Sequence, residues 1–323
     1  MLDLEKLFAE KNITLSSRDL YIKNLTRLND GQPIKNIHFL KDEQEIQAKL
    51  EKYKPNTRRS YYIAIVSLLK VFISQSNGKK YQKLYKKYYS QMESLNKELK
   101  SNNEKSAKER ENWITQEEVL ERLEKLKAII PTLGRKINAT QFHELQKLLL
   151  LGLYALQKPR RNKDYQDMLV FKKKPVSFHY AIDGKGNLVD FLSPTKHNIL
   201  DLKGNQFIFT NYKTMKKFSN QEITIHKDLR DIIDLYLKHH PTFKKSKQPV
   251  QLLVNYQGEP YTNVNDITRL LYKIFDKKIG STMLRHIFLT SKYKNVLDEM
   301  EKDTEAMGTS VDMLENQYVK KGD

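Results

Sequence analysis

Apolar residues recur at helical spacing through the first hundred residues of the chain. The polar residues 16–19 resemble a capping box and predict a helix start. The apolar stripe behind them consists of Leu20, Ile22, Leu25 and Leu28. A second start at residues 54–57 precedes apolar positions that continue to Phe72. Together the stripes predict an all-helical module over residues 1–108.

A basic stretch over residues 77–110 ends this module. Its lysines are interleaved with tyrosines, which favours an amphipathic helix with inward-facing rings over a platform for stacking bases. Residues 101–110 are polar throughout and predict a linker or an exposed helix. Four basic residues are candidate phosphate contacts, with a solvated surface as the alternative: Arg58, Arg59, Lys79 and Lys80.

A second module is predicted over residues 109–323. Thr115 and Glu118 form a capping box, and residues 140–156 form an apolar helix that polar residues interrupt too often for a membrane span. Alternating apolar residues predict a β-hairpin with a lysine-rich turn, its strands at 205–212 and 221–226. Further helices are expected at 228–238, 263–276, 282–297 and 310–319. We therefore expect a mostly α fold with a small antiparallel β-sheet (α+β).

The charge of the chain indicates a polyanionic partner. Its 323 residues include 58 Lys and Arg against 39 Asp and Glu, a net charge of +19 that exceeds what solubility needs. The sequence has no run of 18 apolar residues, no signal peptide and no lipidation motif, so we expect an intracellular protein without a membrane partner. It contains no cysteine, and its eight histidines form no HExxH pair. We therefore expect no metal ion and no other cofactor.

Two basic motifs lie in the first half of the second module. Residues 159–164 read Pro-Arg-Arg-Asn-Lys-Asp, in which Asp164 follows Arg161 by three positions. The predicted hairpin turn contains Lys213 within Asn-Tyr-Lys-Thr. Cutting a phosphodiester with a side-chain nucleophile requires cations around the phosphate oxygens. Arginine suits this task because its planar fork holds two oxygens and stays protonated.

Two further motifs lie near the C-terminal end. Leu-Arg-His at residues 284–286 centres on Arg285, and Met-Gly-Thr-Ser follows at residues 307–310. Tyr318 lies nine residues after Thr309 and 33 after Arg285. With the upstream motifs, this order and spacing resemble the conserved boxes of the tyrosine recombinase (integrase) family, from about residue 112 to the end. The first module is similar to that family's core-binding domain in size and basicity.

The resemblance implies a recombinase or integrase that cuts and rejoins double-stranded DNA through a 3′-phosphotyrosyl intermediate. Arg161 and Arg285 would hold the scissile phosphate. Lys213 would protonate the leaving 5′ oxygen, and Tyr318 would be the nucleophile. Supporting residues would be Asp164, which orients the first arginine, and His286. The alternatives within the motifs are Arg160 to Arg161, and Lys216 and Lys217 to Lys213. A tetramer that assembles on DNA from free monomers or dimers is also implied.

Two positions depart from the family pattern. Thr282 replaces a His or Lys three residues before Arg285, and Thr309 replaces the His or Trp of the later turn. Threonine can donate a hydrogen bond but carries no charge. A DNA-binding protein of recombinase descent that cuts weakly or not at all is therefore one alternative. A second is a type IB topoisomerase-like enzyme, and a third is an RNA-binding or structural helical protein.

Overall fold

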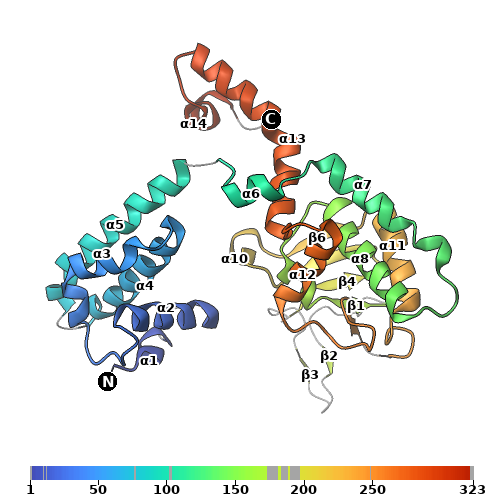
Figure 1. The fold of residues 1–323 in the computed structure, drawn as a ribbon, viewed down its shortest axis with the longest axis horizontal. Coiled ribbons are helices and arrows are strands. Elements are labelled where there is room, and N and C mark those ends of the chain that lie inside the picture. Colours follow the sequence, from blue (N-terminus) through green and yellow to red (C-terminus); the bar gives the residue numbers. More distant parts are fainter. Residues whose placement is uncertain are drawn as a thin grey trace. The chain divides into compact units, whose positions relative to one another are not determined.

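The computed structural model describes residues 2–9, 11, 13–75, 78–101, 104–172, 181–182, 188–189, 197–247 and 249–320. It divides into two compact units, the N-terminal unit Met1–Lys105 and the C-terminal unit Ser106–Asp323 (Figure 1). Ser106 caps α6 (Ala107–Asn112) through reciprocal hydrogen bonds with Glu109. The polar stretch expected to end the first module, residues 101–110, therefore contains the start of the first helix of the second unit.

The N-terminal unit is all helical. Its elements are α1 (Leu4–Ala9), α2 (Leu15–Leu28), the 3₁₀ turn η1 (His38–Lys41), α3 (Glu43–Glu51), α4 (Pro55–Ile73), the 3₁₀ turn η2 (Gly78–Tyr81) and α5 (Gln82–Ser101). The predicted start of α4 is confirmed, with Pro55 in its first turn, where the missing N–H costs nothing. The start predicted for α2 is wrong. Its cap is Thr14, whose side chain accepts a hydrogen bond from the Ser17 N–H.

The tyrosines of the basic stretch do not all face the core. Tyr88 is fully buried, and its hydroxyl donates to the Leu40 carbonyl at 2.8 Å. Tyr89 is 37% exposed and stacks on Tyr85 at 5.6 Å. The prediction of inward rings is therefore correct for Tyr88 and wrong for Tyr89, because adjacent residues lie about 100° apart around a helix.

The C-terminal unit combines helices with a mixed sheet. Its helices are α7 (Gln116–Lys127), η3 (Ile130–Thr132), α8 (Ala139–Ala155), α9 (Asn162–Gln166), α10 (Met215–Phe218), α11 (Lys227–His239), α12 (Val264–Phe275), α13 (Ser281–Ala306), α14 (Val311–Met313) and the π-helical turn η4 (Leu314–Tyr318). The expected core helix at residues 140–156 is confirmed as α8, whose leucines from Leu148 to Leu151 are fully buried. Gly152 allows α11 to approach, since a Cβ there would lie 3.2 Å from Leu229 Cδ1.

The sheet is not wholly antiparallel, so this part of the fold prediction is wrong. Its strands are β1 (Leu169–Phe171), β4 (Ile199–Asp201), β5 (Gln206–Phe209), β6 (Gln221–Thr224) and β7 (Val250–Gln251), in the order β6-β5-β4-β1-β7. β1 and β4 pair in parallel, which a long connection between them permits. β2 (Ala181–Ile182) and β3 (Leu188–Val189) form a separate pair. The predicted hairpin is confirmed as β5 and β6, with Phe207 opposite Ile223 and α10 in the connection.

Helix α13 is longer than the sequence pattern predicts. A helix was expected over residues 282–297, whereas α13 continues through a polar stretch to Ala306. Its first turns are buried at Met283, Leu284 and Ile287, but the described residues from 291 to 299 are all exposed. An exposed helix with polar faces is hard to delimit from apolar periodicity alone. None of the described helices is long and apolar enough to cross a membrane.

His240, which follows α11, is buried in the C-terminal unit. Its Nδ1 accepts hydrogen bonds from the backbone N–H groups of Thr242 and Phe243, at 3.3 and 3.1 Å. Its Nε2 bonds to the Gln251 carbonyl at 3.0 Å. Burial lowers the pKa of this imidazole from 6.5 to about 4, so the ring stays neutral in the folded protein at pH 7.

We expect the protein to lose stability as the pH falls from about 6.5 to 4. The unfolded chain takes up a proton near the ordinary pKa of histidine, whereas folded His240 resists protonation until about pH 4. Acid therefore favours unfolding, by about 3 kcal/mol at the lower end. Urea unfolding from pH 7.5 to 4.5 measures the slope. His240→Gln should lower stability at pH 7.5 and flatten the pH dependence, and equal slopes in both proteins would contradict this expectation.

Candidate active site

Two adjacent arginines lie between α8 and α9. Arg161 is the N-cap residue of α9, with extended backbone (φ −79°, ψ 150°), and its carbonyl accepts the Asp164 N–H at 2.9 Å. Successive side chains of an extended segment point in opposite directions. The side chains of Arg160 and Arg161 therefore point to different surroundings. The sequence left these two residues as alternatives for the first phosphate-holding arginine.

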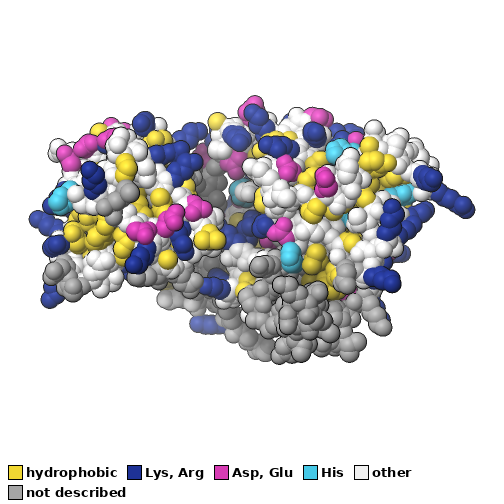
Figure 2. Space-filling model, turned by 90° about the horizontal axis from the view of Figure 1, so that it is seen from below, with side chains coloured by type: hydrophobic (Ala, Val, Ile, Leu, Met, Phe, Trp, Pro, Cys, Tyr) yellow, Lys and Arg dark blue, Asp and Glu magenta, His cyan; other side chains and the backbone are white. Residues whose placement is uncertain are grey.

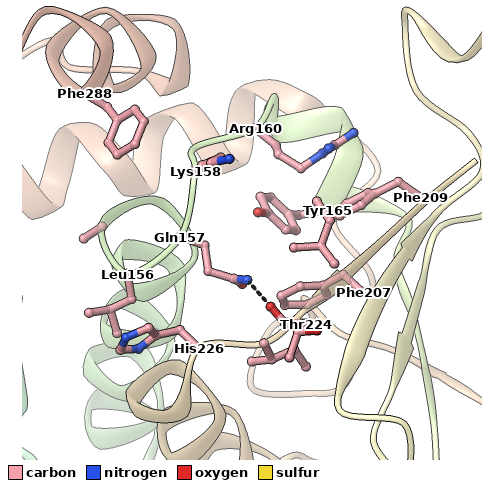
Figure 3. A pocket seen from close by; sticks show the side chains of 13 residues that line it. Leu156, Gln157, Lys158, Arg160, Tyr165, Phe207, Phe209, Thr224, His226 and Phe288 are labelled. Atoms are coloured by element: carbon pink, nitrogen blue, oxygen red, sulfur yellow. Dashed lines mark hydrogen bonds between the residues drawn. The ribbon is translucent and has the colours of Figure 1, made fainter. Parts of the chain in front are cut away.

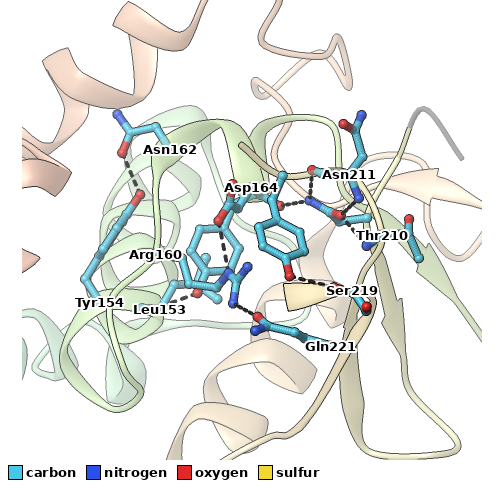
Figure 4. Close-up of polar contacts among 12 residues, drawn as sticks. Leu153, Tyr154, Arg160, Asn162, Asp164, Thr210, Asn211, Ser219 and Gln221 are labelled. Atoms are coloured by element: carbon cyan, nitrogen blue, oxygen red, sulfur yellow. Dashed lines mark hydrogen bonds and ion pairs between the residues drawn. The ribbon is translucent and has the colours of Figure 1, made fainter. Parts of the chain in front are cut away.

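Arg160 is held by four side chains. Its Nε donates to Asp164 Oδ2 at 3.0 Å and its Nη1 donates to Gln221 Oε1 at 2.8 Å (Figure 4). Its guanidinium lies 3.7 Å from the ring centre of Phe209 and 4.9 Å from that of Tyr212. Only 15% of the side chain is exposed. Through these contacts Arg160 links Asp164 of α9 to Phe209 and Gln221 of the β5–β6 hairpin.

Asp164, the ion-pair partner of Arg160, is buried. Burial raises the pKa of its carboxyl, and the charges of Arg160 and Arg161 oppose that rise. The resemblance assigned Asp164 to orient Arg161, but its ion pair is with Arg160. A hydrogen bond from the Arg161 backbone helps to keep the pKa of this buried carboxyl from rising further.

The side chains of Arg161 and Arg285 lie near enough for their charges to interact. Burial lowers the pKa of Arg285, the charges of Arg161 and Arg160 lower it further, and Asp164 has the opposite effect. Such effects require proximity, because Coulomb energies fall with distance. Both side chains are partly exposed, and neither forms an ion pair among the residues that the structure describes. The cluster of three arginines and one carboxylate thus carries excess positive charge, which favours an anion such as phosphate.

Asn198 connects α9 to the loop after β5. Its Nδ2 donates to the carbonyls of Asp164 at 2.8 Å and Asn211 at 3.0 Å. Its Oδ1 accepts the N–H groups of Thr210 at 3.0 Å and Asn211 at 2.8 Å. Figure 4 labels three of the residues that these hydrogen bonds reach, Asp164, Thr210 and Asn211. Asn198 is only 3% exposed, so it fixes the start of the loop that carries Lys213.

Lys213 is exposed at the surface of that loop. It follows Tyr212, whose ring contacts Arg160 and whose hydroxyl donates to the Ser219 carbonyl at 2.6 Å. No ion pair of Lys213 is present within the described residues. Lys213 is thus the chain neighbour of Tyr212, whose ring lies against Arg160. Lys216 and Lys217 lie further on, in α10.

An apolar pocket of about 560 Å³ lies beside Arg160 (Figure 3). Its walls come from the end of α8, the hairpin and α13, and they include Leu156, Phe207 and Phe288. Lys158 and Arg160 also line it (Figure 3). The pocket is large enough for several apolar side chains and has a basic border.

The first turns of α13 present the other residues of the second arginine motif. Thr282 is exposed one turn before Arg285, so a threonine occupies the place where the family has His or Lys. His286 does not face the arginines. Its Nδ1 lies 3.1 Å from Glu109 Oε1, which joins α13 to α6. His286 therefore contacts a side chain of another helix, whereas the resemblance gave it a supporting role in the site.

Tyr318 lies at the other end of α13. Gly308 ends the helix with φ +65°, and Ser310 caps α14. Thr309 bonds through its backbone N–H to the Thr304 carbonyl at 2.8 Å. Tyr318 follows on η4 and is 56% exposed. At 1.5 Å per residue, α13 carries the chain roughly 30 Å from Arg285 to its end. The nucleophile predicted from spacing therefore lies in the segment that follows α13, beyond the turn at Gly308.

The candidate phosphate contacts of the N-terminal unit differ in their surroundings. Arg58 and Arg59 are partly buried on α4, and Arg59 bonds to Asn96 on α5. Lys79 and Lys80 are exposed on η2. Figure 2 shows Lys and Arg side chains over the surfaces of both units, with Asp and Glu between them. Arg59 thus has a structural contact, whereas the two lysines are accessible to an anion.

The residues that hold Arg160 and α9 in place could not be recognised from the sequence. Asn198, Gln221 and Phe209 have no motif or spacing that marks them, because their contacts depend on strand pairing and on the α9 position. Within the described residues, no group of three or more His, Asp or Glu could hold a metal ion. Comparison of the chain with protein-family models, curated proteins and solved structures finds no match.

Proposed function

We propose that this chain is a site-specific DNA recombinase or integrase that cleaves and rejoins duplex DNA through Tyr318. The observation that carries the proposal is the joint site of Arg161 and Arg285, two motif residues from distant parts of the chain. Arg160 is already engaged by Asp164 and Gln221. This leaves Arg161 and Arg285 as the phosphate-holding pair. The net charge of +19 supports a DNA partner, whose affinity would fall steeply with salt.

The proposed reaction is a phosphoryl transfer to tyrosine. The phenolic oxygen of Tyr318 attacks the scissile phosphorus, a new P–O bond forms, and the bond to the 5′ oxygen breaks. The phenolic proton passes to solvent, and Lys213 gives a proton to the leaving 5′ oxygen. Arg161 and Arg285 stabilise the charge on the other phosphate oxygens. The phosphotyrosyl link conserves the bond energy, so a 5′ hydroxyl can reverse the step on the same or another strand.

We further propose that Tyr318 acts on the arginine cluster of a second copy. The exposed end of α13 and the turns that follow carry apolar side chains without cover: Tyr293, Val296, Leu297, Met307, Met313 and Val319. This same end is acidic, with five Asp and Glu and one Lys between residues 295 and 306, in a strongly basic chain. Acidic charge suits contact with protein rather than with DNA. The apolar pocket with Lys158 and Arg160 offers a complementary surface.

A DNA-binding protein that does not cut is the second candidate. Thr282 and Thr309 replace charged or proton-carrying residues of the family, and Tyr318 is 56% exposed. A type IB topoisomerase-like enzyme would use the same tyrosine on a single duplex. Relaxation of supercoiled plasmid by monomers would favour the topoisomerase, and strand exchange between two sites would favour the recombinase.

Covalent trapping tests cleavage directly. The substrate is a pool of random-sequence duplexes with 5′-bridging phosphorothiolate links, which release a thiol that religates poorly, so that adducts accumulate. Wild-type protein should form a covalent adduct on denaturing gels, and Tyr318→Phe should form none. Tyr89→Phe removes an exposed hydroxyl from the N-terminal unit and should behave as wild type. Tight duplex binding without an adduct would leave the non-cutting protein as the correct assignment.

A further inference from the structure

A lysine-lined pocket of about 400 Å³ lies within the N-terminal unit. Its lining comes from η1, the start of α3, η2 and the first turns of α5. The polar residues that line it are Lys41, Lys80, Lys83, Lys87, His38 and Glu43. Four lysines around one concave space repel one another unless an anion neutralises them.

Packing beneath the pocket fixes its walls. The buried Tyr88 hydroxyl donates to the Leu40 carbonyl at 2.8 Å and so joins α5 to η1. Tyr81 lines the pocket and packs edge-on against Phe72 of α4 at 5.4 Å. The backbone that carries the lysines is thus held by core contacts, so little ordering is needed when a ligand binds.

Most of the positive charge is uncompensated. Glu43, the acid among the lining residues, pairs with Lys87 at 2.6 Å. Lys41, Lys80 and Lys83 have no acidic partner among the residues that the structure describes. Lys80, Lys83 and Lys87 also recur at helical spacing, which aligns their ammonium groups along one face. Such a row suits several phosphates held close together.

We propose that this pocket binds clustered phosphate groups, supplied by a DNA backbone or by a free polyphosphate. Lysine is a strongly hydrated point charge with three donors, well suited to phosphate oxygens that approach at different angles. A protein that never cuts DNA could carry the same site, so the inference does not rest on the tyrosine chemistry.

Calorimetric titration of the full chain with sodium tripolyphosphate at low salt tests the pocket. The combined variant Lys41→Gln, Lys80→Gln, Lys83→Gln should weaken binding at least about tenfold. The matched control Lys86→Gln, Lys97→Gln, Lys100→Gln removes the same charge from exposed positions of α5 outside the pocket and should stay within about twofold. Equal losses in both variants, or no binding by wild type, would overturn the proposal.

Glu43→Gln is expected to increase the affinity for tripolyphosphate. A misfolded variant would lose affinity, so an increase cannot result from misfolding. The substitution removes the carboxylate from the pocket and frees Lys87, so tripolyphosphate binding should tighten about three- to tenfold. Unchanged or weaker binding would count against the site. Titration with a 20-base-pair duplex identifies the source of the phosphates. A larger loss of duplex affinity in the pocket variant than in its control assigns the site to DNA, and equal duplex affinities assign it to a free polyphosphate.

Discussion

Replacing Arg285 by alanine is expected to reduce covalent adduct formation by about 10³-fold, with duplex affinity changed by less than about threefold. Arg285 shares its surroundings with Arg161 and has no ion pair within the described residues. Its charge therefore contributes most when negative charge develops on the phosphate in the transition state. Adduct yield over time on the phosphorothiolate pool measures cleavage, and fluorescence anisotropy measures affinity.

The matched control for this change is Arg269→Ala. Arg269 lies on α12, its side chain is 69% exposed, and it pairs with Asp266 at 2.9 Å. Removing it takes away the same charge at the surface and should leave the adduct yield unchanged. Arg161→Ala should resemble Arg285→Ala. If Arg285→Ala and Arg269→Ala formed adduct equally well, the arginine cluster would not be the catalytic site.

A mixture of two inactive variants is expected to recover cleavage. Tyr318→Phe keeps the arginine cluster but has no nucleophile, and Arg285→Ala keeps the nucleophile but has a damaged cluster. In the proposed assembly Tyr318 of one copy acts on the arginine cluster of another, so a donor and an acceptor copy complete one site. Random pairing of equal amounts in a head-to-tail assembly gives roughly a quarter of the wild-type adduct.

The control for the mixture is Arg285→Ala combined with the double variant Arg285→Ala, Tyr318→Phe. This pair contains no intact cluster and should give no adduct. Adduct formation in the first mixture but not in this control would establish that Tyr318 of one copy acts at the arginine cluster of another. Absence of recovery, with wild type active, would show that each copy uses its own Tyr318.

Strong local patterns explain which parts of the fold the sequence predicted. α4, α8 and the β5–β6 hairpin each have an apolar repeat bounded by a cap or a turn. The parallel pairing of β1 with β4 joins segments far apart in the chain, and short apolar strands do not encode their partners. The length of α13 was missed because its second half is exposed and polar.

Some residues of the candidate site could likewise be predicted from the sequence, and others could not. Motif order alone marked Arg285 and the pair Arg160 and Arg161 as candidates, and in the folded chain the charges of Arg161 and Arg285 act on each other. The choice between Arg160 and Arg161 required the contacts of Arg160 with Asp164, Phe209 and Gln221. These contacts depend on the register of the hairpin against α9, which no local pattern specifies.

The identity of the residue joined to DNA tests the central claim most directly. The adduct formed on the phosphorothiolate pool would be digested with nuclease and trypsin, and the peptide that carries the residual nucleotide would be sequenced by mass spectrometry. The proposed mechanism predicts a single modified peptide with the nucleotide on Tyr318. A nucleotide on any other residue, or tight DNA binding with no modified peptide, would contradict it.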